Sequence, residues 1–288
     1  MTRKALGQFI LVGFLWGVPY LFMRVAVREF EPSVVVFGRV LIGALILFPI
    51  AFHRKVIGIT LKGFKWILAY ALLEMCGPWY LITHAEKEIN SGLAGLLVAT
   101  VPIWSIIYSS MAGDKTVWHA KRLFGIVIGF VGLILIVGIE AITGSSDLFS
   151  VLQTVLAAIL YSTAMALILH KMPTGDGVAI NAIAMAITAV IFAPWALTSL
   201  PSRTPSLEAT SSLIGLGVLS TGLAFMIYFN LVRTIGQARG SLVTYLNTAF
   251  AVVLGVIILN EPLTIGIIVG LPLVLIGSYF ASKKPVAP

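Results

Sequence analysis

Charged residues are scarce in this chain. Of its 288 residues only 10% are Asp, Glu, Lys or Arg, and 59% are hydrophobic, whereas a soluble domain is about a quarter charged. No polar stretch is long enough to form a separate soluble domain. This composition indicates an integral membrane protein. In such a chain the net charge of +8 indicates basic loops on one side of a membrane rather than nucleic-acid binding.

Several features of soluble enzymes are also missing. The chain has no GxxxxGK[ST] loop to hold a nucleotide phosphate and no GxSxG turn to present a nucleophilic serine. Its single cysteine, Cys76, excludes an intramolecular disulfide. The four histidines do not have the paired spacing of zinc ligands; they are His53, His84, His119 and His170. We expect a protein that is not an enzyme and has no cofactor or metal; an intramembrane enzyme stays open, but nothing favours it.

What the chain does have is long apolar runs. A helix needs about 20 mostly apolar residues to cross the hydrocarbon core of a membrane. Backbone polar groups in lipid must be satisfied within the segment, so helices are expected rather than strands. The predicted spans are 5–27, 34–52, 64–84, 91–112, 120–139, 148–170, 177–199, 209–233, 239–259 and 264–282. The first run is too long for a signal peptide, so it counts as a span.

The distribution of basic residues predicts the orientation. Cytoplasmic loops carry an excess of Lys and Arg. With the N-terminus inside, the inner side receives 14 of the 19 Lys and Arg residues: Arg3, Lys4, Arg54, Lys55, Lys62, Lys65, Lys115, Lys121, Arg122, Lys171, Arg233, Arg239, Lys283 and Lys284. We expect a multi-pass protein of the cytoplasmic (inner) membrane with both termini in the cytoplasm.

The second half of the chain repeats the first. The stretch Gly240–Ser282 has the pattern of Ala94–Gly138, two apolar runs separated by a short charged turn. Other pairs recur at a spacing of 145 or 146 residues: Trp16 with Tyr161, Pro49 with Pro194, Trp79 with Phe225, and Gly125 with Gly270. Because each copy has an odd number of spans, five, the second copy enters the membrane from the opposite side. The prediction is an all-α membrane fold of ten helices in two inverted five-helix repeats, residues 1–145 and 146–288, around a central cavity. Alternating-access transporters typically have this architecture.

Two charged residues lie inside predicted spans. Glu74 is near the middle of the third, where a charge costs about 2.5–3.5 kcal/mol and an acid usually faces a cavity or carries protons. On a continuous helix His84 shares its face. Both are candidates for proton coupling or for binding a substrate amine. The alternative for Glu74 is a protonated or hydrogen-bonded packing residue near Arg39. Arg39 lies near the end of its span, and we expect its side chain to reach the headgroups rather than bind a carboxylate.

Aromatic and polar residues away from the span ends suggest a substrate cavity. Each alone is explained by packing, and Trp or Tyr near a span end by the membrane interface. Together they suit an amphipathic organic substrate. The predicted substrate-binding residues are Trp16, Tyr20, Trp79, Tyr80, Trp104, Tyr161, Phe225, Tyr228, Tyr245 and Asn247.

Other residues have structural interpretations. Pro102 is expected to bend the fourth span. The pairs Gly125/Gly129 and Gly266/Gly270 predict close helix contacts, either between the two halves or in a homodimer. Glu261, in the turn Asn260-Glu261-Pro262, is interpreted as a helix-turn cap rather than a transport residue.

These residues resemble the drug/metabolite transporter superfamily, specifically its EamA-type members. The resemblance rests on Leu15-Trp16-Gly17, on Arg39 and above all on Leu259–Gly277 (LNEPLTIGIIVGLPLVLIG), and it covers nearly the whole chain. Within the superfamily the sequence is most similar to the YddG branch of amino-acid exporters. In the first half Asp114-Lys115 replaces the family's acidic-Pro turn. The resemblance implies a ten-span fold and efflux of amino acids, aromatic ones included, from the cytoplasm.

The lead hypothesis is therefore a secondary transporter that exports amino acids by alternating access, without an ATP site. Its expected partners are small amino-acid substrates and the lipid bilayer, not nucleic acid. The alternatives are a transporter of another small organic or cationic metabolite or drug, and a structural membrane protein that transports nothing. The sequence leaves open whether transport is coupled to protons and whether the protein is a monomer or a homodimer.

Overall fold

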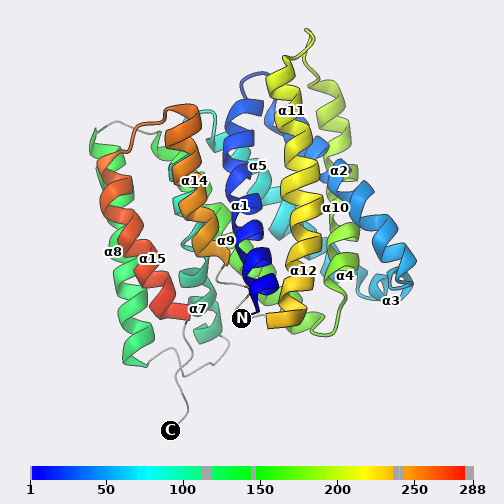
Figure 1. The fold of residues 1–288 in the computed structure, drawn as a ribbon, viewed down its shortest axis with the longest axis horizontal. Helices are drawn as coiled ribbons and strands as arrows, with labels where there is room; N and C mark the ends of the chain where they lie inside the picture. Colours follow the sequence, from blue (N-terminus) through cyan, green and yellow to red (C-terminus); the bar gives the residue numbers. More distant parts are fainter. Residues whose placement is uncertain (1, 112–118, 144–146, 236–239, 241–242, 283–288) are drawn as a thin grey trace.

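The computed structural model describes residues 2–111, 119–143, 147–235, 240 and 243–282 (Figure 1). Every regular element in these ranges is a helix, so the predicted all-α class is confirmed. The turn Asp114-Lys115, together with Arg239, Lys283 and Lys284 of the charge count, lies outside the described residues.

The first half of the chain forms nine of these elements. In order they are α1 (Arg3–Ala26), α2 (Pro32–His53), α3 (Ile57–Leu61), α4 (Phe64–Ala71), η1 (Leu72–Cys76), α5 (Gly77–Ala85), α6 (Ser91–Val98), α7 (Val101–Met111) and α8 (Ala120–Thr143). The second half follows with α9 (Leu148–Lys171), α10 (Gly177–Thr198), α11 (Leu207–Gly215), η3 (Leu216–Leu223), α12 (Ala224–Ile235), α14 (Val243–Leu259) and α15 (Ile265–Ser282).

Seven helical stretches are long and apolar enough to cross a membrane. They correspond to the predicted first, second, third, fourth, sixth, seventh and eighth spans. Helices α14 and α15 are apolar but shorter, and α8 is helical throughout its described range. A membrane protein with several spanning helices is thus supported, whereas the crossing of all ten segments stays a prediction.

Three predicted spans are interrupted helices. The third and the eighth each contain a π-helical segment, η1 and η3, in which the turn takes in one extra residue. The fourth is divided into α6 and α7 at Ala99–Thr100, just before Pro102. Proline cannot donate the backbone hydrogen bond that a continuing helix requires. At the bend expected at Pro102 the α-helix is therefore interrupted over two residues, Ala99 and Thr100.

Long helix pairs build the bundle. Helix α1 packs along α14, α2 along α10, and α8 along α15, so each pair joins the two halves of the sequence (Figure 1). We call the end where α1 begins and α15 ends the proximal end, and the opposite one the distal end.

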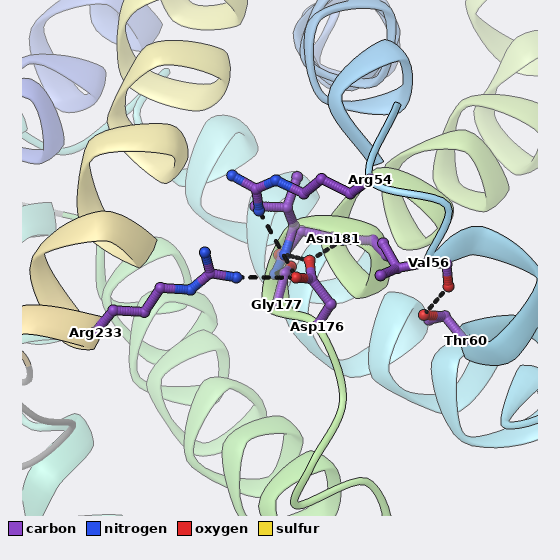
Figure 2. A network of polar contacts seen from close by, with 9 residues as sticks. Arg54, Val56, Thr60, Asp176, Gly177, Asn181 and Arg233 are labelled. Atoms are coloured by element: carbon purple, nitrogen blue, oxygen red, sulfur yellow. Dashed lines mark hydrogen bonds and ion pairs between the residues drawn. The ribbon is translucent and has the colours of Figure 1, made fainter. Parts of the chain in front are cut away.

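A network of charges ties three helices at the proximal end (Figure 2). Asp176 is the N-cap of α10, and its carboxylate accepts hydrogen bonds from the backbone N–H groups of Val178 (2.9 Å) and Ala179 (3.1 Å). Arg54, which follows α2, and Arg233, on α12, approach the same carboxylate at 3.7 and 3.1 Å. A carboxylate at a helix N-terminus is favoured by the backbone donors and the helix dipole.

Replacing Asp176 with Ala should lower thermal stability, because the cap and both arginine contacts are lost. The cap alone contributes about 1 kcal/mol. Asp147→Ala is the matched control: Asp147 caps α9 by accepting from the Ser150 N–H (2.8 Å), and no described ion pair involves it. Thermal midpoints in detergent should fall further for Asp176→Ala, and the difference should shrink in high salt. Equal losses would show that the arginines add nothing.

Candidate functional site

The centre of the bundle holds a buried arginine. Arg39 of α2 is 8% exposed, so the expectation that it reaches the headgroups is wrong. Its Nε donates to Thr221 Oγ1 at 2.9 Å, and its guanidinium lies 3.7 Å from the centroid of the Trp79 ring. Such a cation–π contact holds the guanidinium plane in place.

Arg39 has no carboxylate partner within 4.0 Å among the described residues. A buried charge is costly unless it is paired. The arginine is thus fixed in position while its positive charge stays uncompensated by any ion pair. It could receive the carboxylate of a ligand.

The helices reach Arg39 because small residues face one another around it. Thr221 lies in η3, and its hydroxyl also donates to the carbonyl of Leu216, five residues earlier (2.8 Å). That spacing fits the wide π turn. Opposite it, α2 carries Gly43, where a Cβ atom would come within 2.6 Å of the Thr221 methyl group. A larger residue at position 43 would push η3 away from Arg39.

Three predicted aromatic residues surround Arg39. Trp79 and Tyr20 are buried, at 4% and 6% exposure. Tyr161, on α9, is half-buried and lies close to Trp79, Tyr20 and Arg39. We call Tyr20, Arg39, Trp79 and Tyr161 the central cluster. It draws on α1, α2 and α5 of the first half and α9 of the second.

Glu74 lies beside the central cluster. It is half-buried in η1, and its Oε2 atom is buried without a hydrogen-bond partner. The tyrosines near it are Tyr70, Tyr161 and Tyr228. Tyr161 therefore neighbours both charges, yet Glu74 and Arg39 form no ion pair with each other.

A second aromatic group lies toward the proximal side. The Trp16 ring packs against Phe225 and Tyr228, at centroid distances of 5.5 and 4.6 Å. Phe225 stacks in turn on Phe229 at 5.9 Å. Three more predicted site residues thus form one group that joins α1 to α12. Tyr228 connects this group with Glu74.

Helices α7 and α14 carry three further predicted site residues, Trp104, Tyr245 and Asn247. Trp104 packs on Phe130 of α8 at 5.4 Å and donates from its indole to Thr100 Oγ1 at 3.2 Å. On α14, Tyr245 is half-buried and Asn247 is buried, with the Asn247 Oδ1 atom accepting from the hydroxyl of Thr248 at 3.3 Å.

Tyr80 and His84 form a separate group. Tyr80 packs on Trp195, which is 48% exposed, at 4.8 Å, and His84 Nδ1 lies 3.1 Å from Gln153 Oε1. Each π turn in η1 takes in one extra residue. The side chains after Glu74 are therefore rotated about the helix axis relative to their positions on a regular α-helix. The shared face of Glu74 and His84 was derived for a continuous α-helix, so that derivation does not apply here.

Glu261 is a cap, but of a helix in the other half. Its carboxylate accepts from the N–H and the hydroxyl of Ser91 (3.0 and 2.7 Å) and from the N–H of Gly92 (3.3 Å), at the start of α6. Asn90, the N-cap residue itself, makes no side-chain cap bond. Glu261 therefore supplies the cap that α6 lacks locally.

Two hollows in the surface lie away from the central cluster. One, of about 590 Å³, is lined by Pro49, Phe52, His53, Lys55, Ile57 and Gly58. The other, of about 430 Å³, lies between the loops 27–31 and 199–204. None of the residues predicted to bind substrate lines either hollow.

The recurrence of aromatic residues predicted the aromatic part of the site, but not that Arg39 and Thr221 are partners. A span over 34–52 puts Arg39 a few residues from its outer end, and that position predicts a side chain that reaches the headgroups. Helix α2 in fact begins at Pro32, and its Val34 and Val35 are buried in one cluster with Ala26 of α1 and Ala85, the last residue of α5. An arginine within an otherwise apolar span was the signal available.

Comparison with known proteins places the chain in a family. The model of the EamA-like transporter family matches residues 3–138 and again residues 148–283. A solved crystal structure aligns over 98% of both chains with a TM-score of 0.66 and 15% sequence identity. That likeness concerns the fold alone.

Curated relatives cover nearly the same length. The uncharacterized transporter YoaV of Bacillus subtilis is 28% identical over 283 residues, 97% of this chain and 96% of the relative. The uncharacterized inner membrane transporter YedA of Escherichia coli K12 is 25% identical over 297 residues, 97% of this chain and 93% of that protein. The two matches of the family model span almost the whole chain, and the protein therefore belongs to the EamA-like transporter family.

Proposed function

We propose that this protein is a secondary transporter that exports amino acids, aromatic ones included, from the cytoplasm by alternating access. One observation carries the substrate class: among the residues that the structure describes, Arg39 and Glu74 each have no ion-pair partner, and both neighbour Tyr161. A zwitterion brings one charge of each sign at a short separation. The carboxylate would bind Arg39, the amine would bind Glu74, and an aromatic side chain would contact Trp79 and Tyr161.

The two-repeat mechanism has independent support. The two segments matched by the family model begin 145 residues apart and end 145 residues apart. The π-helical segments η1 and η3 recur at nearly the same offset. Repeat-related helices also pack on each other, α2 on α10 and α8 on α15. Inverted repeats around a central site are typical of transporters that expose the site to each side in turn.

The orientation also belongs to this proposal. Lys and Arg residues lie at the proximal end, among them Arg3 and Lys4 at the start of α1, Arg54 after α2 and Lys62 after α3. Membrane proteins retain such residues in the cytoplasm. We therefore propose that the proximal end lies in the cytoplasm and that the membrane is the inner membrane, which the name of the relative YedA also gives for that protein.

Counterflow in proteoliposomes tests the substrate class. Vesicles with purified protein are loaded with one unlabelled amino acid, and uptake of the same radiolabelled compound is followed. The panel pairs phenylalanine with 3-phenylpropanoate, which lacks the amine, and with phenethylamine, which lacks the carboxylate. A higher rate of exchange for phenylalanine than for either analogue supports the proposal. Exchange of the amine alone would identify a cation transporter instead, and no exchange by any amino acid would contradict the proposal.

Glu74→Gln should remove the preference for the amine. Loss of one charge-assisted hydrogen bond weakens binding by about tenfold. The apparent affinity for phenylalanine should therefore fall toward that of 3-phenylpropanoate, while the affinity for 3-phenylpropanoate itself stays constant. Competition in the counterflow assay measures both values. An unchanged ratio between the two compounds would exclude Glu74 from amine binding.

A further inference from the structure

At the distal end a contact between the two halves of the chain centres on Glu261. Its carboxylate caps α6 through Ser91 and Gly92. Gly255 of α14 makes room for this contact, since a Cβ atom there would lie 2.3 Å from Glu261 Oε2 and 2.7 Å from Ser91 Oγ. The carboxylate is thus enclosed between α6, α14 and the turn that follows α14.

A second carboxyl group is buried next to this contact. Glu86 follows α5 and is 0% exposed, and neither of its carboxyl oxygens has a hydrogen-bond partner. The Arg24 guanidinium donates to the backbone carbonyl of Glu86 rather than to its side chain. No described Lys or Arg forms an ion pair with the Glu86 carboxyl group.

The charges around Glu86 come from three directions. Arg24 and Tyr20 face it from α1, Arg39 from α2, and Glu261 from the turn after α14. Burial and the negative charge of Glu261 raise the pKa of Glu86 well above its usual value, although the two arginines oppose the shift. The unpartnered oxygens fit a neutral carboxyl group better than a carboxylate, because an isolated buried charge is costly.

We propose that Glu86 is a proton-binding site coupled to closure of the distal end. This inference rests on the alternating access of the proposed function. Closure brings Glu86 out of water and next to the Glu261 carboxylate, and the end closes only after Glu86 has taken up a proton. Opening returns Glu86 to water, where the proton leaves. Each opening and closing of the distal end thus releases one proton to the distal side and takes one up from it, so the rate of transport depends on the pH of that side.

The direction of the pH effect follows from the raised pKa. Closure is fully favoured below the ordinary glutamate pKa of about 4.3. As the pH rises from there toward the higher pKa of the closed form, the ratio of closed to open protein falls by up to about tenfold per pH unit. Alkaline conditions on the distal side therefore open this end.

Cysteine labelling at the distal end tests the proposal without any substrate. Ser33, in the first turn of α2, is 1% exposed and its hydroxyl has no partner, so Ser33→Cys is a buried reporter that loses no hydrogen bond. With Cys76→Ser as background, a membrane-impermeant maleimide is applied to purified protein between about pH 5.5 and 8.5. Dividing each rate by that of the Glu86→Gln variant at the same pH cancels the ionisation of the thiol itself.

The expected ratio of rates rises with pH by up to about tenfold per unit. Glu86→Asp, which can still titrate, should restore a pH dependence. Glu88→Gln is the matched control, since Glu88 is exposed in the same loop and should leave the profile as it is. If the reporter is labelled but the ratio of rates does not change with pH, Glu86 is not the proton site, while alternating access still stands. If the reporter is never labelled at any pH or in any variant, the distal end does not open, and both proposals fall.

Discussion

Arg39→Gln is expected to reduce transport of amino acids more than any other single change in the central cluster. The glutamine keeps a polar group near Thr221 but removes the charge over Trp79 that would bind the substrate carboxylate. Charge-assisted hydrogen bonds of this kind contribute about 2–3 kcal/mol, so the apparent affinity for phenylalanine should fall by about 30- to 150-fold. Competition in the counterflow assay measures the change.

The analogues decide whether the loss concerns the carboxylate. Phenethylamine has no carboxylate, so its weak competition should be nearly the same in Arg39→Gln and in the unchanged protein. Arg28→Gln is the control, because Arg28 is an exposed arginine of the distal end that pairs with Glu208 at 3.7 Å, and such pairs contribute little. If phenylalanine and phenethylamine weaken together, Arg39 supports the fold rather than the substrate. The thermal midpoint in detergent distinguishes that case.

Gly277→Val should prevent the protein from folding. At position 277 of α15 a Cβ atom would lie 2.4 Å from the backbone nitrogen of Gly129 and 2.7 Å from the carbonyl oxygen of Gly125. Backbone atoms cannot rotate away, so α8 and α15 would have to separate along their length. Overpacking of this kind costs about 1–3 kcal/mol or more. We expect a lower thermal midpoint for Gly277→Ala and no monodisperse protein for Gly277→Val in detergent size-exclusion chromatography.

Gly7→Ala is the appropriate comparison for this prediction. Gly7 is exposed on α1, and a Cβ atom there meets nothing within 4 Å. Alanine also has the higher helix propensity, by about 1 kcal/mol, so the midpoint should stay constant or rise. A midpoint for Gly277→Ala as high as that of Gly7→Ala would show that α8 and α15 are not tightly apposed. Both values need one heating rate, since membrane proteins often unfold irreversibly.

The contact between Gly129 and Gly277 also clarifies a question that sequence left open. The small residues of the fifth and tenth predicted spans were consistent with packing of the two halves or with a dimer. In the structure they bring α8 and α15 of the same chain together, with Gly132 against Val274 and Gly270 against Ile136. This use accounts for the glycines without a second copy of the chain.

Some features of this protein followed from the sequence alone. Apolar runs of about 20 residues predict membrane helices because a backbone in lipid must satisfy its own hydrogen bonds. The recurrence of Trp16 and Pro49 at the spacing of Tyr161 and Pro194 predicted two related halves. These are local or periodic properties, and each can be read without knowing which helices touch. The family resemblance likewise predicted helices that span a membrane and two related halves, without the contacts between helices.

Contacts between distant residues were decided only by the tertiary structure. Whether Arg39 reaches water or lies over Trp79 depends on how η3 and α5 pack around it. The π-helical segment that contains Glu74 also changes which residues share its helix face. The same holds for Glu86, which the sequence places in a polar loop next to Lys87 and Glu88, yet which the packing of α1, α5 and the turn at Glu261 removes from water entirely. Burial and charge pairing depend on neighbours far apart in the chain, and a single sequence does not specify those neighbours.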